Sequence, residues 1–241
     1  MSSSRVFVVM TAAGQSRRMG GTDKLTLPVL GRPLLAHTAL AFLEWPRLEA
    51  MAVSVSPGRE QELEMTFARH CPNPQKVTVL TGGQERQDSV RLGLELLHSI
   101  HAPTPTDFVM IHDGARPFID TVLLEALLDS LATCDGVLPA TPVRDTIKRV
   151  DGFSVVRTED RETLRMVQTP QAFRFCAILE LHRRAHREDF FGTDDASLME
   201  HYGGKVNWIS GPAHNLKVTV PEDIALLTEL ARSAVVSRGV H

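Results

Sequence analysis

Short apolar runs alternate along the chain with longer segments of helical periodicity. The runs are rich in residues that favour strands, and they cover 6–10, 50–54, 77–80, 108–111 and 136–139. Residues 35–43 and 123–131 instead place mostly apolar side chains on one face of a helix. Such alternation is typical of βαβ units, so it predicts an α/β fold with a mainly parallel sheet covered by helices on both faces. Ligands of such sheets bind beyond the carboxyl ends of the strands.

Two segments depart from this alternation. Residues 147–150 and 153–156 flank the turn signal Asp151-Gly152 and predict a β-hairpin. Because this hairpin is too polar for the core, we expect a β-arm at about 143–168 that projects from a single domain spanning 1–241. Further on, residues 219–222 combine a capping box with a proline in the first turn, which predicts that the last helix starts there.

Composition excludes several classes of protein. The chain has 241 residues, 43% hydrophobic and 23% charged, enough to bury a core without disulfides or a structural metal. No apolar run approaches the ~20 residues of a membrane helix, and residues 1–5 lack the pattern of a secretory leader. The 3 cysteines are far apart, which favours a reducing cytoplasm over a disulfide framework or a Cys-x-x-Cys metal site.

Charge is nearly balanced overall but locally uneven. The formal net charge of −3 lacks the basic excess of a general nucleic-acid binder. Basic residues nevertheless gather at 17–24 and again at 144–165. Local positive charge on a mildly acidic protein suits a small anionic ligand better than a polymer, although a solvated basic face is the structural alternative.

The turn after the first strand carries the strongest local signal. Residues 12–20 read AAGQSRRMG, and Lys24 follows shortly afterwards. Small residues let the backbone wrap closely around a ligand, and successive N–H groups in such a loop bind anions. Arg18 and Lys24 add positive charge. The turn lacks the Gly-Lys-Ser/Thr end of a P-loop and the GxGxxG of a dinucleotide site. A tight strand–helix turn that simply needs glycine is the alternative.

Two further loops carry candidate chemistry. Asp113 follows a buried strand and Arg116 comes three residues later, so the pair could hold magnesium or a substrate hydroxyl and a phosphate. Alternatively, the aspartate caps the next turn and pairs with that arginine. The loop led by Gly82 and Gly83 enters a helix; capping by Asp88 or Ser89 explains part of it, and base recognition could explain the rest.

Three patterns can be compared with a zinc site, a short-chain dehydrogenase and a serine hydrolase, and each lacks a required residue. His182 and His186 are four residues apart, but arginines surround them and no HExxH glutamate is present, so we expect a surface pair rather than a zinc site. Tyr202 has Val206 where a short-chain dehydrogenase needs lysine. No GxSxG elbow of a serine hydrolase occurs.

Taken together, seven motifs resemble the 2-C-methyl-D-erythritol 4-phosphate cytidylyltransferase family of the non-mevalonate isoprenoid pathway. They lie at 12–19, 82–90, 112–117, 142–149, 169–173, 193–197 and 215–223, in the family's order and spacing. The resemblance implies a Rossmann-like nucleotidyltransferase domain with a protruding β-arm, a homodimer, and the substrates CTP and a phosphorylated polyol. It also implies Mg²⁺ or another divalent cation, held mainly by the CTP phosphates without a protein ligand. Neither a nucleic-acid nor a membrane partner is expected.

The resemblance also implies roles for individual residues. Around the CTP phosphates it places Ala12, Ala13, Gly14 and the catalytic Arg18, Lys24 and Lys217. On the cytosine and ribose loop it places Gly83, Gln84 and Ser89. In contact with methylerythritol phosphate it places Asp113, Arg116, Thr146, Arg161, Thr169 and Thr193. The chain departs from the common pattern at Ser16, Asp23 and Gln84, where glycine, proline and aspartate are frequent in the family.

The implied chemistry agrees with the residue types. A phosphomonoester has a second pKa of about 6, so it attacks the α-phosphorus without a protein base. Positioned cations and N–H donors then stabilise the charge that builds on the phosphoryl oxygens. Two alternatives stay open: a cytidylyltransferase that uses ribitol 5-phosphate, and a non-catalytic nucleotide-binding regulatory protein.

Overall fold

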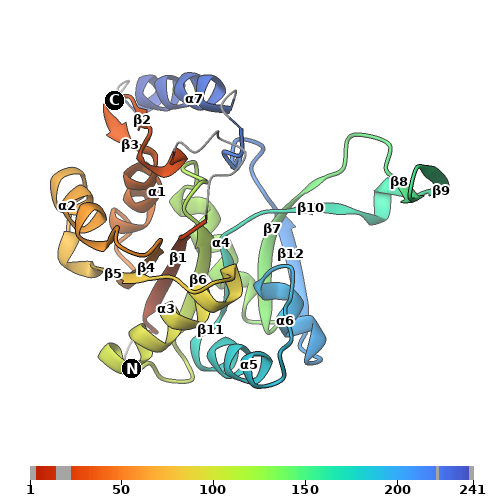
Figure 1. Cartoon of the computed structure of the whole chain (residues 1–241), viewed down its shortest axis with the longest axis horizontal. Coiled ribbons are helices and arrows are strands. Elements are labelled where there is room, and N and C mark those ends of the chain that lie inside the picture. The colour runs from red at the N-terminus through yellow and green to blue at the C-terminus, as the bar shows by residue number, and fades with distance from the viewer. Residues whose placement is uncertain (1–3, 15–22, 221–222, 239–241) are drawn as a thin grey trace.

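The computed structural model describes residues 4–14, 23–220 and 223–238, and an eight-stranded sheet forms its centre (Figure 1). The strand order is β10-β7-β11-β6-β1-β4-β5, and β12 pairs with β7. The strands are β1 (Val6–Ala12), β4 (Leu48–Val55), β5 (Val77–Thr81), β6 (Phe108–Asp113), β7 (Gly136–Pro142), β10 (Arg165–Val167), β11 (Gln171–Arg174) and β12 (Val206–Ser210). Strands β4, β1 and β6 run parallel, as do β4 with β5 and β12 with β7.

Helices cover both faces of this sheet (Figure 1). They are α1 (Leu34–Leu43), α2 (Glu60–His70), α3 (Arg86–His101), α4 (Thr121–Ser130), α5 (Phe175–Arg187), α6 (Asp195–His201) and α7 (Asp223–Arg238). Short 3₁₀ turns occur at η2 (Lys24–Thr26), η3 (Pro74–Lys76) and η4 (Arg161–Thr163), and a small ribbon joins β2 (Pro28–Val29) to β3 (Arg32–Pro33). None of the helices in the described ranges has both the length and the apolar character needed to cross a membrane.

Two hydrophobic cores lie on opposite faces of the sheet. Along β1, Val6, Val8 and Met10 pack into the core shared with α1, α2 and α4. Their neighbours Phe7 and Val9 pack into the core shared with α3, α5 and α6. A strand buried on both faces reads as a continuous apolar run, and this explains why the sequence pattern located β1, β4 and β6. The predicted α/β class with a mainly parallel, doubly covered sheet is confirmed.

Three strands of the sheet lay outside the sequence prediction. Strands β10 and β11 run antiparallel to β7, and β11 is also antiparallel to β6. Each is only three or four residues long, too short to show a period. Strand β12 pairs only with β7 and leaves Trp208 51% exposed. Edge strands of this kind lack the continuous apolar run of a central strand.

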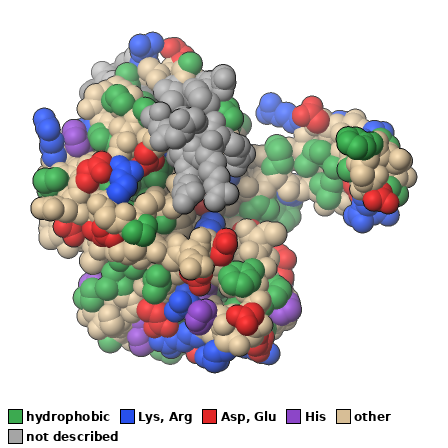
Figure 2. Space-filling view, viewed as in Figure 1, with side chains coloured by type: hydrophobic (Ala, Val, Ile, Leu, Met, Phe, Trp, Pro, Cys, Tyr) green, Lys and Arg blue, Asp and Glu red, His purple; other side chains and the backbone are tan. Residues whose placement is uncertain are grey.

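A hairpin projects from the body between β7 and β10 (Figure 1). Its strands are β8 (Lys148–Asp151) and β9 (Ser154–Thr158), and every residue in both is exposed. Asp151 pairs with Ser154, so Gly152 and Phe153 form the turn, and the predicted Asp151-Gly152 turn is wrong by one position. Gly152 has φ +55°, which suits glycine at the first central position of a tight hairpin. The hairpin stands clear of the body in the space-filling view (Figure 2).

The last helix directly follows the segment in which the sequence predicts its start. Helix α7 starts at Asp223, whose carboxylate accepts hydrogen bonds from the backbone N–H groups of Thr219 and Val220 at 2.7 and 3.0 Å. Asp223 therefore supplies a side chain that reaches back to the residues before the helix. Pro221 and Glu222, which the predicted capping box used, lie outside the described residues.

Candidate active site

A cavity of about 930 Å³ opens at the carboxyl ends of four parallel strands. Its walls are the segments that follow β1, β4, β5 and β6, at 11–14, 56–57, 82–86 and 113–115. Lys24, Leu25, Ser89, Lys217 and Thr219 also line it. This is the place where open α/β sheets bind their ligands. The motifs at 12–19, 82–90, 112–117 and 215–223 thus all contribute to one cavity.

Close backbone packing shapes the loop after β5. A side chain at Gly82 would lie 2.5 Å from the Cβ of Ala13, and one at Gly83 would lie 2.3 Å from the Cβ of Asp88. The hydroxyl of Ser89 accepts a hydrogen bond from Gly83 N–H at 3.0 Å and donates to the carbonyl of Glu85 at 3.2 Å. Only glycine fits at positions 82 and 83, and Ser89 holds the loop in shape from the start of α3. Asp88, not Ser89, supports the helix end by accepting from the Glu85 N–H.

The two lysines converge on one short segment. Lys24 Nζ donates to the carbonyl of Val218 at 2.7 Å, and Val218 N–H donates to the carbonyl of Ala115 at 2.9 Å. Lys217 lies next to Val218 and points its Nζ at Asp113. Asp23, a departure from the family pattern, caps the 3₁₀ turn that carries Lys24 by accepting from Leu25 N–H. Residues far apart in sequence therefore place two ammonium groups at one edge of the cavity.

Asp113 lies at the centre of a group of positive charges. Its carboxylate is 2.7 Å from Lys217 Nζ, 3.3 Å from Arg86 Nε and 3.8 Å from Arg116 Nε. Burial alone would raise the pKa of Asp113, but Arg86 and Lys217 outweigh it and hold that pKa far below its usual range. The carboxylate is therefore ionised at any working pH. It orients cations, and its lone pairs already have partners.

A hydrogen-bonded chain fixes the end of β6 from behind. Asp113 N–H donates to Thr169 Oγ1 at 3.1 Å, and Thr169 Oγ1 is 3.0 Å from His112 Nδ1. His112 Nε2 is 3.0 Å from the carbonyl of Arg116, an acceptor only. His112 must then carry its proton on Nε2 and accept from Thr169 at Nδ1. Burial lowers the pKa of His112 to about 4, so the ring is neutral near pH 7.

The structure brings together most, though not all, of the predicted site residues. The cavity is lined by Ala12, Ala13, Gly14, Lys24, Gly83, Gln84, Ser89, Asp113 and Lys217. Arg116 and Thr169 lie behind Asp113: Arg116 donates to the carbonyl of Asn215 at 2.8 Å, and Thr169 is buried. Arg18 and Ser16 lie outside the described residues.

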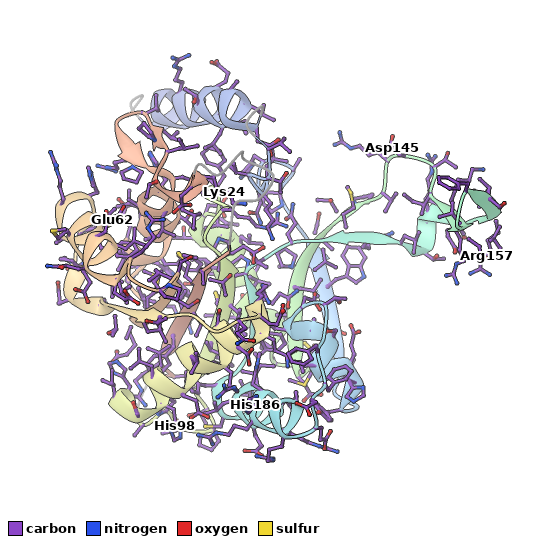
Figure 3. The ribbon with its side chains drawn as sticks, viewed as in Figure 1. Lys24, Glu62, His98, Asp145, Arg157 and His186 are labelled. Carbon is purple, nitrogen blue, oxygen red and sulfur yellow. The ribbon has the colours of Figure 1, made fainter. Side chains whose placement is uncertain are left out.

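Thr146, Arg161 and Thr193 do not line the cavity. Thr146 and Arg161 are exposed on the arm, where Arg161 donates to the carbonyl of Arg144 at 3.0 Å. Thr193 is exposed just before α6. Figure 3 shows Lys24 on the body, well apart from the arm residues Asp145 and Arg157. In this single chain the arm residues are remote from the cavity.

The sequence prediction missed Arg86 and misread His182. Arg86 lines the cavity as the first residue of α3 and contacts Asp113; its place directly after a glycine loop was the available signal. His182 is fully buried, so the predicted surface pair is wrong for this residue, whereas His186 is exposed. His182 lies among Ile178, Leu179 and Ala185 on the buried face of α5. Within the described residues, no group of three His, Cys, Asp or Glu could hold a metal ion.

Comparisons with known proteins agree over nearly the whole chain. Residues 6–232 match the model of a family described as IspD, 2-C-methyl-D-erythritol 4-phosphate cytidylyltransferase. A protein of that name from Syntrophotalea carbinolica is 41% identical over 226 residues, covering 92% of this chain and 94% of the relative. Another from Geobacillus thermodenitrificans is 39% identical over 229 residues, covering 94% and 97%.

Solved structures give the same result. The 2-C-methyl-D-erythritol 4-phosphate cytidylyltransferase of Thermus thermophilus superposes with a TM-score of 0.73 at 32% identity, covering 93% of this chain and 98% of that one. The 4-diphosphocytidyl-2C-methyl-D-erythritol synthase of Anaerococcus prevotii superposes with a TM-score of 0.80 at 26% identity, covering 95% and 99%.

Proposed function

The chain belongs to the 2-C-methyl-D-erythritol 4-phosphate cytidylyltransferase family, and we propose that the cavity beyond β1, β4, β5 and β6 holds its substrates. The enzyme joins CTP to 2-C-methyl-D-erythritol 4-phosphate and releases pyrophosphate, a step of non-mevalonate isoprenoid biosynthesis. The observation that supports this use of the cavity best is the convergence of Lys24, Lys217 and Arg86 on glycine-rich loops. Neither ribitol 5-phosphate nor a purely regulatory role is favoured by the relatives' names.

The proposed chemistry depends on positive charge around the α-phosphorus of CTP. The acceptor phosphate attacks the α-phosphorus of CTP and pyrophosphate leaves, so negative charge builds on the α-phosphoryl oxygens. Lys24 and Lys217 are placed to stabilise that charge, and we assign Arg18 to the same role from its sequence position. Backbone N–H groups of 12–14 add donors at the phosphates. No side chain has to take up a proton, because the attacking phosphate is already ionised.

The loop at 82–89 is the proposed reader of cytosine. Its backbone packs closely against Ala13 and Asp88, so the position of the loop is fixed. Gln84 is exposed at the cavity and can both donate to and accept from a base edge. A loop fixed in this way can hold carbonyl acceptors in constant positions, and such acceptors suit the N4 amino group of cytosine. Gln84 replaces an aspartate that is common in the family, so part of the recognition passes to the backbone.

A divalent cation fits the cavity as a companion of the nucleotide. The acidic residues that line the cavity in the described part of the chain are Glu85 and Asp113, and the Asp113 carboxylate is already paired with Lys217 and Arg86. The residues thus suit Mg²⁺ held by phosphate oxygens better than Mg²⁺ held by carboxylates. Bound there, the ion would neutralise part of the triphosphate charge.

The acceptor site is proposed to need two chains. Thr146 and Arg161 belong to the exposed arm, whereas Asp113, Arg116 and Thr169 belong to the body. A two-stranded hairpin is marginally stable by itself in water, and this one exposes Val150 by 58%, Val155 by 61% and Phe153 completely. A two-fold pair of arms would cover these side chains and bring each Arg161 to its partner's cavity. The enzyme is therefore proposed to be a homodimer.

A cytoplasmic location is proposed from the cysteines. All three are free, and burial raises the pKa of the Cys71 thiol to about 11, so this thiol is unreactive. Free thiols persist in a reducing compartment. Cell fractionation with an antibody against the native protein would test the location.

Pyrophosphate release tests the proposed function. Purified enzyme with Mg²⁺ and CTP is given methylerythritol phosphate or ribitol 5-phosphate at equal concentration. We expect release with the first and a kcat/KM at least tenfold lower with the second, about 1.4 kcal/mol of discrimination. CTP is expected to be strongly preferred over ATP and GTP. Values within threefold for all nucleotides would contradict base recognition by 82–89, and equal values for both acceptors would contradict the assigned acceptor.

A further inference from the structure

A chain of alternating charges runs from the cavity into the core. It begins at Lys217 and Asp113 on the cavity wall and continues through Arg86, whose Nη1 donates to Asp195 Oδ2 at 2.8 Å. Asp195 is the first residue of α6 and is only 1% exposed. Its other oxygen is 3.2 Å from Nε2 of His182, which is fully buried on α5. Neither Asp195 nor His182 lines the cavity.

We propose that Asp195 and His182 are positioning residues for catalysis, because they hold Arg86 in the orientation that fixes Asp113 and, through Asp113, the ammonium group of Lys217. This inference rests on the proposed role of Lys217 at the triphosphate. It adds residues on α5 and α6 that touch no substrate to the set that determines the rate. Neither was selected by any sequence motif for this role.

Arg86 links the cavity wall to the buried carboxylate of Asp195. Its Nε faces Asp113 Oδ1 and its Nη1 faces Asp195 Oδ2, so one planar guanidinium bridges two carboxylates. A guanidinium presents its donors in a rigid fork, so fixing one edge fixes the other. Without Asp195, nothing in these contacts would stop the guanidinium from turning about its bond to Asp113. Asp195 therefore sets the direction from which Arg86 meets Asp113.

The position of Asp195 is itself well determined. Its backbone stands at the N-terminus of α6, where Asp194 accepts from Ser197 N–H at 2.9 Å. Gln171 on β11 receives the N–H of Ala196 at 2.9 Å and donates to Asp194 at 2.7 Å. The end of the helix is thus anchored to the sheet on both sides of Asp195. From this fixed backbone, the carboxylate of Asp195 faces Arg86 with one oxygen and His182 with the other.

Charge balance at Asp113 links this support to Lys217. Arg86 and Lys217 contact different oxygens of the same carboxylate, Oδ1 and Oδ2. Each cation therefore limits the rotation of the carboxylate that the other one uses. If Arg86 turns away, Asp113 Oδ1 is left with a 3.5 Å hydrogen bond from Thr11 Oγ1, so the carboxylate is held less firmly and the direction of Lys217 into the cavity is less well fixed. Misplacement of a reacting or stabilising group by about 1 Å can cost about 10²-fold in rate.

His182 supports Asp195 in the same way that Asp195 supports Arg86, with a smaller expected effect. Its Nε2 lies within ion-pair distance of Asp195 Oδ1, although neither atom meets hydrogen-bond geometry. The imidazole is the polar group that faces this oxygen in the described structure. A neutral amide of similar reach could replace it, whereas an aliphatic side chain would leave Asp195 Oδ1 against an apolar surface.

Asp195→Asn gives the direct test, since it removes the charge and keeps the shape. We expect kcat for pyrophosphate release to fall about tenfold, with KM for CTP changed less than about threefold because the glycine loops are untouched. Glu95→Gln is the matched control: the Glu95–Arg183 pair also joins α3 to α5, at 2.6 Å, but does not reach the cavity. It should stay within twofold of the wild type.

A double-mutant cycle separates positioning from general support of the fold. In a Lys217→Ala background, Asp195→Asn should lower kcat by less than about twofold, because the group it positions is gone. The same tenfold loss in both backgrounds, or an equal loss in Glu95→Gln, would overturn the inference. If the wild type itself releases no pyrophosphate, the proposed function fails instead, so the two failures are distinguishable.

A second pair of variants carries the test if Asp195→Asn does not fold. His182→Leu should lower kcat about three- to tenfold, while His182→Gln should stay within about twofold of the wild type. Circular dichroism and thermal unfolding establish that each variant is folded at the assay temperature. If both His182 variants had the same kcat as Glu95→Gln, the inference would be overturned.

Discussion

The cavity and the arm use the same charged residue types in opposite ways. At the cavity, the Asp113 side chain is 10% exposed and contacts three cations from three different parts of the chain. On the arm, Arg149 and Arg157 share Glu159 while remaining 62% and 58% exposed. Exposed ion pairs are screened by water and contribute little, whereas removing one partner of a buried pair typically costs about 3–5 kcal/mol.

This difference agrees with the proposal that one chain supplies the cavity and a partner chain supplies the arm. At the cavity, the glycine loop is closely packed, the Asp113 carboxylate is paired, and Lys24 and Lys217 have partners within the same chain. The arm has hydrophobic side chains on its surface and no core of its own (Figure 2). Preorganised donors suit the stabilisation of developing charge. An exposed hairpin suits contact with a partner chain. We therefore expect mutations at the cavity to lower kcat and mutations on the arm to weaken the dimer.

The largest effect is expected at the cavity lysines. Lys217→Ala and Lys24→Ala should each lower kcat by at least ~10²-fold, because each removes a cation from the developing phosphoryl charge. The fold should survive, since Lys217 is 42% exposed. Lys205→Ala, at an exposed lysine away from the cavity, is the matched control. Near wild-type pyrophosphate release by both cavity variants would mean that the chemistry occurs elsewhere.

The next largest effect is expected at the tip of the arm, where a mutation should change the dimer dissociation constant rather than kcat. Phe153 is fully exposed in the single chain. Burying an aromatic side chain stabilises by about 1.5–3 kcal/mol, and a two-fold dimer buries two, so Phe153→Asp should raise the dimer dissociation constant by at least about 10²-fold. Analytical ultracentrifugation measures this constant. Val122→Asp, at an exposed apolar residue of α4, serves as the control. An unchanged constant in Phe153→Asp would remove the arm tip from the interface.

The smallest effect concerns acid stability of the body. His112 has its pKa lowered by burial to about 4 from 6.5, so between these values the unfolded chain binds a proton that the folded chain does not. Stability therefore falls as the pH drops from about 6.5 towards about 4, by about 2 kcal/mol between pH 7 and pH 5. Urea unfolding of the wild type and His112→Gln at both pH values measures the difference. An equal loss in both proteins would show that His112 is not the group responsible.

The central strands and the cavity loops could be predicted from the sequence because their causes are local. Strand β1 is buried on both faces and therefore reads as a continuous apolar run. Gly82 and Gly83 were found because no other residue fits there, and Asp113 because it follows a buried strand. At these positions the residue type itself reflects a local physical requirement, so it can be recognised from the sequence.

The remainder depends on contacts between distant segments. Nothing next to Arg86 or His182 in sequence indicates that both meet Asp195, since α3, α5 and α6 come together only in the folded chain. His182 lay on a helix rich in arginine, and only packing shows that its side of α5 is buried. The turn at Gly152 was missed by one residue because strand register depends on the pairing of β8 with β9.

Subunit mixing tests the central claim most directly: one chain supplies the cavity and its partner supplies the arm. Arg161→Ala and Lys24→Ala enzymes should each be nearly inactive. After verified subunit exchange, one of the two sites in each heterodimer contains both Lys24 from one chain and Arg161 from the other. An equimolar mixture should then regain about one quarter of wild-type activity, since half of the dimers are mixed and each has one intact site. A mixture that stays as inactive as its components, or a wild-type enzyme that is fully active as a monomer, would contradict the claim.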